Sequence, residues 1–71
     1  MKFLSDVKLN EDFEITHIDS NLKNLCLSHG LFEGSQGKVI EKLPLKGGIV
    51  LNLRESCLGL RYQNAAKIQV K

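Results

Sequence analysis

Cysteine and histidine, two common ligands of transition metals, stand close together once in this chain of 71 residues. Cys26 and His29 lie three residues apart within LKNLCLSHGLFEG, residues 22–34. On a helix this spacing puts both side chains on one face, where they offer two ligands to Fe²⁺ or Zn²⁺, with Cys57 or His17 as distant additions. A structural zinc site normally has two such pairs. Burial of Cys26 in the core, with His29 at a helix C-terminus, is therefore the alternative interpretation.

Other reactive patterns are weaker. The stretch GSQGKVI superficially resembles a phosphate-binding loop, but Phe32 stands where its first glycine belongs and Val39 where its hydroxyl belongs. No serine, histidine and aspartate set, and no cysteine and histidine set, has the local spacing of an activated nucleophile. We therefore expect no enzyme activity and no required cofactor.

Composition limits the partners. The formal net charge is +2, lysines and carboxylates alternate, and basic residues do not separate the aromatic ones. We expect no nucleic-acid binding, although a small nucleic-acid-binding barrel stays an alternative. No run approaches the roughly 18 apolar residues of a membrane span, and the start has no secretory apolar region. We expect a cytoplasmic protein with reduced cysteines and no membrane insertion.

The cysteine and histidine pair requires a short helix with defined ends. An apolar stripe predicts this helix over residues 22–29, with Asp19 or Ser20 as its N-cap. Gly30 follows at the position where helices commonly end in the left-handed conformation, which glycine enters without steric cost. Leu31 is then placed to fold back against the helix.

Alternating apolar residues divide the rest of the chain into short strands. Gly34 and Gly47 mark turns, Pro44 ends a strand or lies at a sheet edge, and Gly59 predicts a bulge or a close backbone approach. Short strands with one short helix predict a mainly β domain, a small barrel whose closure removes exposed sheet edges. The expected strands are residues 12–18, with Phe13, Ile15 and His17 on one face, then 38–43, whose inward face is ambiguous, 49–53, 57–61 and 67–70, with a tight connection at 54–56 and a helical turn at 62–66.

Three motifs occur in a distinctive order: HGLFEGS, KVIEKLPLKGGIVLNL and LGLRYQNAAKIQV. Together they resemble ferrous iron transport protein A, the FeoA family, from Leu25 to Val70, and the opening FLSDVKLNEDFEITHI resembles the family start. Asn10 replaces a common glycine, and asparagine is the non-glycine residue best able to enter the left-handed region. Cys26 and His29 replace usual leucines. The matching positions are Gly30, Leu31, Gly34, Pro44, Gly47, Leu60, Arg61, Ala66, Ile68 and Val70.

The resemblance implies one domain over residues 1–71, an SH3-like β-barrel of five or six short strands with one short helix and a helical turn near the C-terminus. It implies a cytoplasmic, non-enzymatic accessory that docks to FeoB, the membrane ferrous-iron transporter with a GTP-binding domain. A related domain ends iron-dependent repressors as an interaction module. A metal-sensing domain that uses Cys26 and His29 is the alternative function.

The helix and the loop after it form the expected contact surface. The alternative for Leu22 and Leu31 is that their side chains close the end of the barrel. The alternative for Arg61 is a hydrogen bond to a backbone carbonyl that stabilises a turn. The expected partner-binding residues are Leu22, Leu25, Leu31, Phe32 and Arg61.

Overall fold

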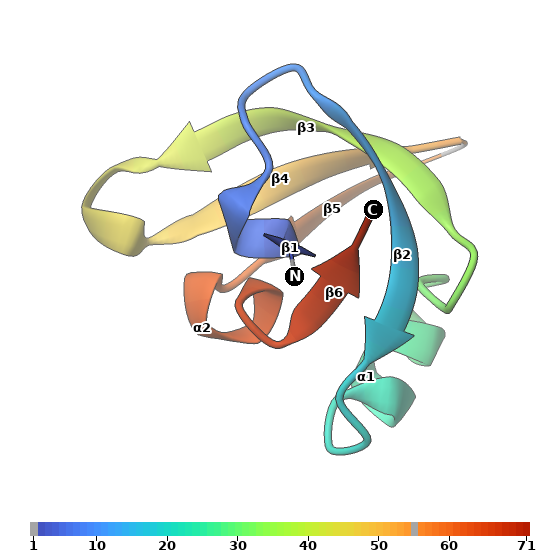
Figure 1. Ribbon diagram of the computed structural model, residues 1–71. Coiled ribbons are helices and arrows are strands. Elements are labelled where there is room, and N and C mark those ends of the chain that lie inside the picture. Colours follow the sequence, from blue (N-terminus) through green and yellow to red (C-terminus); the bar gives the residue numbers. More distant parts are fainter. Residues whose placement is uncertain (1, 55) are drawn as a thin grey trace.

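The computed structural model describes residues 2–54 and 56–71. These residues form a mainly β fold in which short helical segments connect the strands (Figure 1). In chain order the elements are β1 (Lys2–Phe3), the 3₁₀ turn η1 (Leu4–Asp6), β2 (Asp12–Ile18), α1 (Lys23–Ser28), β3 (Gln36–Leu43), the 3₁₀ turn η2 (Pro44–Lys46), β4 (Gly48–Leu53), β5 (Cys57–Leu60), α2 (Tyr62–Ala65) and β6 (Ile68–Val70).

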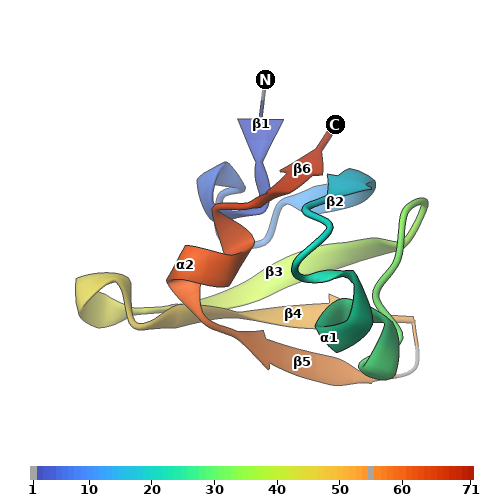
Figure 2. The same ribbon diagram turned by 90° about the horizontal axis from the view of Figure 1, so that it is seen from below.

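The described strands form one antiparallel sheet in the order β1-β6-β2-β3-β4-β5. The beginning of β2 pairs with β3 and its later part pairs with β6, so β2 arches across the molecule (Figure 1). This arrangement confirms the mainly β, SH3-like fold. The expected closure was wrong, because β1 and β5 do not pair among the described residues. The helix α2, which joins β5 to β6, contacts β4 and η1 (Figure 2).

Two β-bulges decide which side chains face inward. In β2 the register shifts between Ile15 and His17, so Ile18 is buried and His17 is exposed. The expectation that His17 shares the inner face was therefore wrong, because one extra residue reverses the alternation. In β3 the shift lies between Val39 and Glu41, and Val39 is the buried residue. This settles the ambiguous face of that strand.

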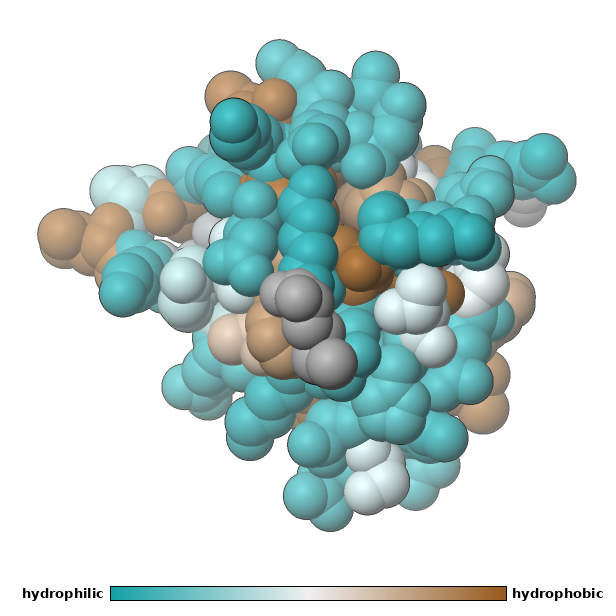
Figure 3. Space-filling model, viewed as in Figure 1, coloured by the Kyte–Doolittle hydropathy of each residue, from teal (hydrophilic) through white to brown (hydrophobic). Residues whose placement is uncertain are grey.

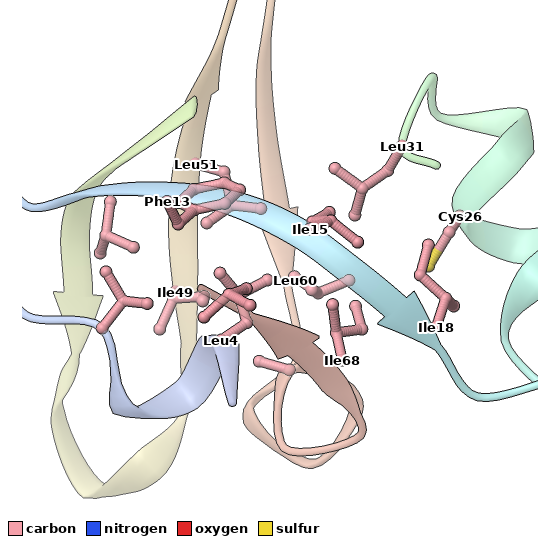
Figure 4. Close-up of a cluster of buried hydrophobic side chains, with 14 of the residues drawn as sticks. Leu4, Phe13, Ile15, Ile18, Cys26, Leu31, Ile49, Leu51, Leu60 and Ile68 are labelled. Carbon is pink, nitrogen blue, oxygen red and sulfur yellow. The ribbon is translucent and has the colours of Figure 1, made fainter. Parts of the chain in front are cut away.

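The core extends from the curved sheet to the inner side of α1 (Figure 4). Phe13 and Ile15 of β2 lie within it, as their alternation predicts. At its far end Cys26 lies beside Ile18 and Leu31 (Figure 4). Its buried apolar residues are Leu4, Val7, Phe13, Ile15, Ile18, Leu22, Cys26, Leu31, Val39, Ile49, Leu51, Leu60, Ala65, Ile68 and Val70.

Of the glycines in β4 and β5, Gly48 is the one that has no room for a Cβ atom. A Cβ there would lie 2.8 Å from the carbonyl oxygen of Leu60, and its φ is +142°. Gly59, by contrast, pairs regularly with Val50, and a Cβ there would meet nothing within 4 Å. The predicted bulge or close approach at Gly59 was wrong, as was its role as a turn residue, because it lies inside β5.

Other local predictions hold. Asn10 has a φ of +67°, the left-handed conformation expected for it, and its N–H donates to the oxygen of Val39 at 2.6 Å. Pro44 ends β3 and opens η2, which leads into the turn at Gly47. The connection at 54–56 is tight, since the N–H of Leu53 donates to the oxygen of Ser56 at 2.7 Å, while its central residue, 55, lies outside the described residues.

Candidate docking surface at the helix end

The helix α1 begins at Lys23, directly after Leu22, with no side chain bonded to its first turn. The predicted N-cap at Asp19 or Ser20 was therefore wrong. Asp19 instead accepts a hydrogen bond from the N–H of Asn21 at 2.8 Å, two residues on. An aspartate makes this local bond readily, and here it shapes the turn that precedes the helix rather than the helix start.

The end of α1 is the predicted glycine cap. Gly30 has a φ of +80°, and its N–H donates to the oxygen of Leu27 at 3.0 Å. The N–H of Leu31 donates to the oxygen of Cys26 at 2.8 Å. These two bonds form a Schellman motif, in which the residue after the glycine packs back against the helix. Leu31 is accordingly buried, as is Cys26.

The turn at residues 32–35 then fixes Phe32 in an outward position. The N–H of Phe32 donates to Oγ of Ser35 at 3.0 Å, and the N–H of Ser35 donates back to the oxygen of Phe32 at 2.9 Å. The N–H of Gly34, whose φ is +96°, donates to the oxygen of Ile15 at 2.8 Å. Gly34 thus has the turn role predicted for it, and the turn is anchored to β2.

Three apolar side chains remain exposed on this end of the molecule: Leu25 by 43%, Leu27 by 63% and Phe32 by 54%. We call these three residues the helix-end surface. Two of them adjoin a hollow of about 290 Å³ whose floor includes the buried Ile18 and Leu31. Leu27 and Phe32 line this hollow, so an apolar side chain from another molecule would meet carbon on several sides.

The rim of the hollow carries charge. Glu33 and Lys23 line it, and Nζ of Lys23 lies 3.9 Å from Oε2 of Glu33. Nδ1 of His17 lies 3.5 Å from the same oxygen and forms an ion pair with it when the imidazole is protonated. His17 therefore lies beside Glu33 at the edge of the hollow. An apolar centre with a polar rim is the usual layout of a protein contact.

The predicted partner-binding residues do not all lie on the same surface. Leu25 and Phe32 are on the helix-end surface, whereas Leu22 and Leu31 are buried in the core, which is the alternative that the sequence left open for them. Arg61 is exposed at the N-cap of α2, beside Gly48 and away from this surface. Leu27 was missed because it lies off the apolar stripe of the helix. A large apolar residue on the otherwise polar side of a short amphipathic helix is the sequence signal that would have found it.

The two proposed metal ligands face different surroundings. Cys26 is buried, and burial raises the pKa of its thiol, which disfavours the thiolate that binds metals. His29 is the exposed C-cap residue of α1. Among residues 2–54 and 56–71, no three histidine, cysteine or acidic side chains lie close enough to share a metal ion. Cys57 is a free, exposed cysteine on β5.

Two further observations concern nucleic-acid binding and membrane-spanning segments. Phe13, one of the aromatic residues that a nucleic-acid surface would need, is buried in the core. Within the described part of the chain, no helix has the length and apolar character required to cross a bilayer.

Comparisons with known proteins identify the family. The model of the FeoA domain matches residues 2–71. The solution structure of the FeoA protein from Chlorobium tepidum is 27% identical, with a TM-score of 0.86, and the match covers 97% of this chain and 68% of that one. The FeoA-like protein from Clostridium acetobutylicum is 25% identical, with a TM-score of 0.85, over 97% of this chain and 83% of that one.

A more distant neighbour shows the same fold in another setting. The manganese regulator SloR has a TM-score of 0.85 at 15% identity, and the match covers 99% of this chain but only 34% of SloR. A search of curated proteins found no match. Because the FeoA model matches almost every residue, the chain belongs to the FeoA family of iron-uptake accessory domains.

Proposed function

We propose that this protein is a cytoplasmic accessory of ferrous iron uptake that acts by docking its helix-end surface onto the cytoplasmic, GTP-binding part of a FeoB transporter. The observation that carries the proposal is the exposed apolar surface of Leu25, Leu27 and Phe32, two of which, Leu27 and Phe32, line a hollow with a charged rim, on a member of the FeoA family. Apolar side chains held in place around a concavity favour protein contact over solvent exposure.

The fold supports this role because it makes the surface rigid. The Schellman motif fixes the end of α1, and the hydrogen bonds of the 32–35 turn fix Phe32. The surface is thus organised before any partner arrives, which reduces the ordering entropy that association would otherwise cost.

The test is capture of the purified protein by the cytoplasmic domain of the transporter from the same organism, with and without Fe²⁺ and guanine nucleotide. We expect Leu25→Asp and Phe32→Asp each to weaken binding about tenfold or more, since each buries a charge in the contact. Leu9→Asp is the matched control, because Leu9 is 53% exposed and lies outside the helix-end surface. Capture that neither helix-end change weakens would refute the proposed surface.

A further inference from the structure

The turn that joins β3 and β4 carries the most exposed large apolar side chain among the described residues. Leu45 is 100% exposed, so it packs against nothing in this chain. The turn projects from the molecule at the left of Figure 1, and the corresponding projection in Figure 3 has hydrophobic surface at its extremity. We call residues 43–47 the hairpin tip. An apolar tip on a convex projection contributes nothing to the core of the protein.

The backbone of the hairpin tip is strained at the same place. Leu45 has φ and ψ of +57° and +35°, and Lys46 has a φ of +55°. Residues other than glycine, asparagine and aspartate seldom enter this left-handed region, because Cβ approaches the neighbouring carbonyl oxygen. The chain therefore keeps a leucine where the conformation favours another residue and where packing gains nothing from it. Strain of this kind points to a role outside the fold.

Positive charge surrounds the hairpin tip. Lys46 belongs to the tip, Lys42 directly precedes it and donates a hydrogen bond from Nζ to the carbonyl oxygen of Ser5 at 3.5 Å, and Arg61 lies at its base next to Gly48. Nζ of Lys46 lies 5.5 Å from the centre of the Tyr62 ring. From residue 41 to residue 48 the chain has one acidic residue, Glu41, and two lysines, and Arg61 adds a third cation at the base.

We propose that the hairpin tip contacts an anionic lipid surface, with Leu45 inserted at the level of the acyl chains and the cations at the headgroups. A leucine at the outermost point, cations behind it and a tyrosine at the base match the depth profile of a bilayer interface. A flat apolar layer suits a convex tip, since no concave surface surrounds Leu45. The contact is distinct from the helix-end surface and does not depend on any protein partner.

The contact is weak and reversible. One leucine and three cations bury less apolar area than a single myristoyl chain, whose membrane partition constant is about 10⁴ M⁻¹. Binding to vesicles should therefore require millimolar lipid. Each cation near an anionic surface contributes about a fivefold factor in partitioning, and salt reduces this factor.

The test measures co-sedimentation of the full chain with phosphatidylcholine vesicles that contain or lack phosphatidylserine. We expect binding to the anionic vesicles, weaker binding to the neutral ones and loss at high salt. Leu45→Asn should lower the partition constant about tenfold or more, since it removes a full leucine side chain from the acyl layer. Asparagine tolerates the left-handed conformation, so this variant keeps its fold. Leu27→Asn, on the helix-end surface, is the control and should bind vesicles like the parent protein.

Fluorescence gives a second, independent readout. The chain has no tryptophan, so Leu45→Trp introduces a single indole at the tip. Its emission should shift to the blue on addition of anionic vesicles. Absence of vesicle binding, or binding that Leu45→Asn leaves unchanged, would overturn the proposal. Loss of transporter capture in Leu45→Asn without any change in vesicle binding would also overturn it, and would assign the tip to a protein socket.

Discussion

The two ends of this molecule expose leucine in different ways. At the helix end, Leu27 stands over a hollow whose floor is the buried Leu31, and the backbone around it is relaxed because glycine occupies the left-handed position. At the hairpin tip, Leu45 has no neighbour, and the leucine itself is left-handed. The exposed apolar area at the helix end adjoins the core, whereas that at the tip is separate from it. Exposure alone therefore does not separate the two kinds of surface. Concavity marks the helix end, and backbone strain marks the hairpin tip.

The largest effect should come from the floor of the hollow. Leu31→Ala removes a fully buried side chain and should lower the free energy of unfolding by about 2–5 kcal/mol. Leu25→Ala, on the exposed side of α1, should change it by about 0.5 kcal/mol or less. Urea denaturation of both variants measures the difference. Equal losses would mean that the helix end has no division between core and surface.

The base of the hairpin offers a second contrast. Gly48→Ala should destabilise the protein by roughly 1–3 kcal/mol, because its Cβ would approach the oxygen of Leu60 at a φ that alanine rarely adopts. Gly59→Ala, which places its Cβ in open space on the neighbouring strand, should be neutral or stabilise by about 0.5 kcal/mol. Thermal unfolding of the two variants checks this prediction. A tolerated alanine at position 48 would contradict the strained geometry of the hairpin.

Identical substitutions at the two exposed leucines should have effects of opposite sign. Leu45→Asn relieves the left-handed leucine and should raise the free energy of unfolding by about 0.5 kcal/mol. Leu27→Asn lowers the helix propensity within α1 and should reduce it by about 0.5 kcal/mol. Chemical denaturation of both proteins in parallel gives the comparison. If both variants lose stability, the tip is not strained.

The smallest effect concerns alkaline pH. Burial raises the pKa of the Cys26 thiol, so the folded protein holds the proton more tightly than the unfolded chain. The stabilisation is complete below the ordinary thiol pKa of 9.0 and is lost as the pH rises through the higher folded value. Stability should therefore decline above about pH 9.

Two alanine variants separate this contribution from other alkaline titrations. Cys26→Ala should remove the part of the decline that the buried thiol causes. Cys57→Ala, at an exposed thiol, should keep it. Unfolding followed from pH 7 to 10, a range of about three units around the thiol pKa, measures both slopes. A decline that is identical in the two variants would exclude Cys26 as its source.

Local chemistry accounts for what the sequence predicted well. Gly30 as a helix stop, Asn10 in the left-handed region and Pro44 after β3 each depend on the conformations that one residue allows. The alternation of Phe13 and Ile15 predicted their burial, since side chains alternate between the faces of a strand. The burial of Cys26 was open between packing and metal binding, and its place beside Ile18 and Leu31 favours packing.

By itself, the sequence determined the class of fold, the stop of the helix and the turns, because these depend on residues close together in the chain. Only the tertiary structure decided the inward turn of Ile18, the tight glycine at Gly48 and the separation of Arg61 from the helix end. It also decided that Leu31 forms the floor of the hollow while Leu27 is exposed beside it. These features arise where distant strands meet and a bulge shifts their register, and no local spacing encodes such a shift.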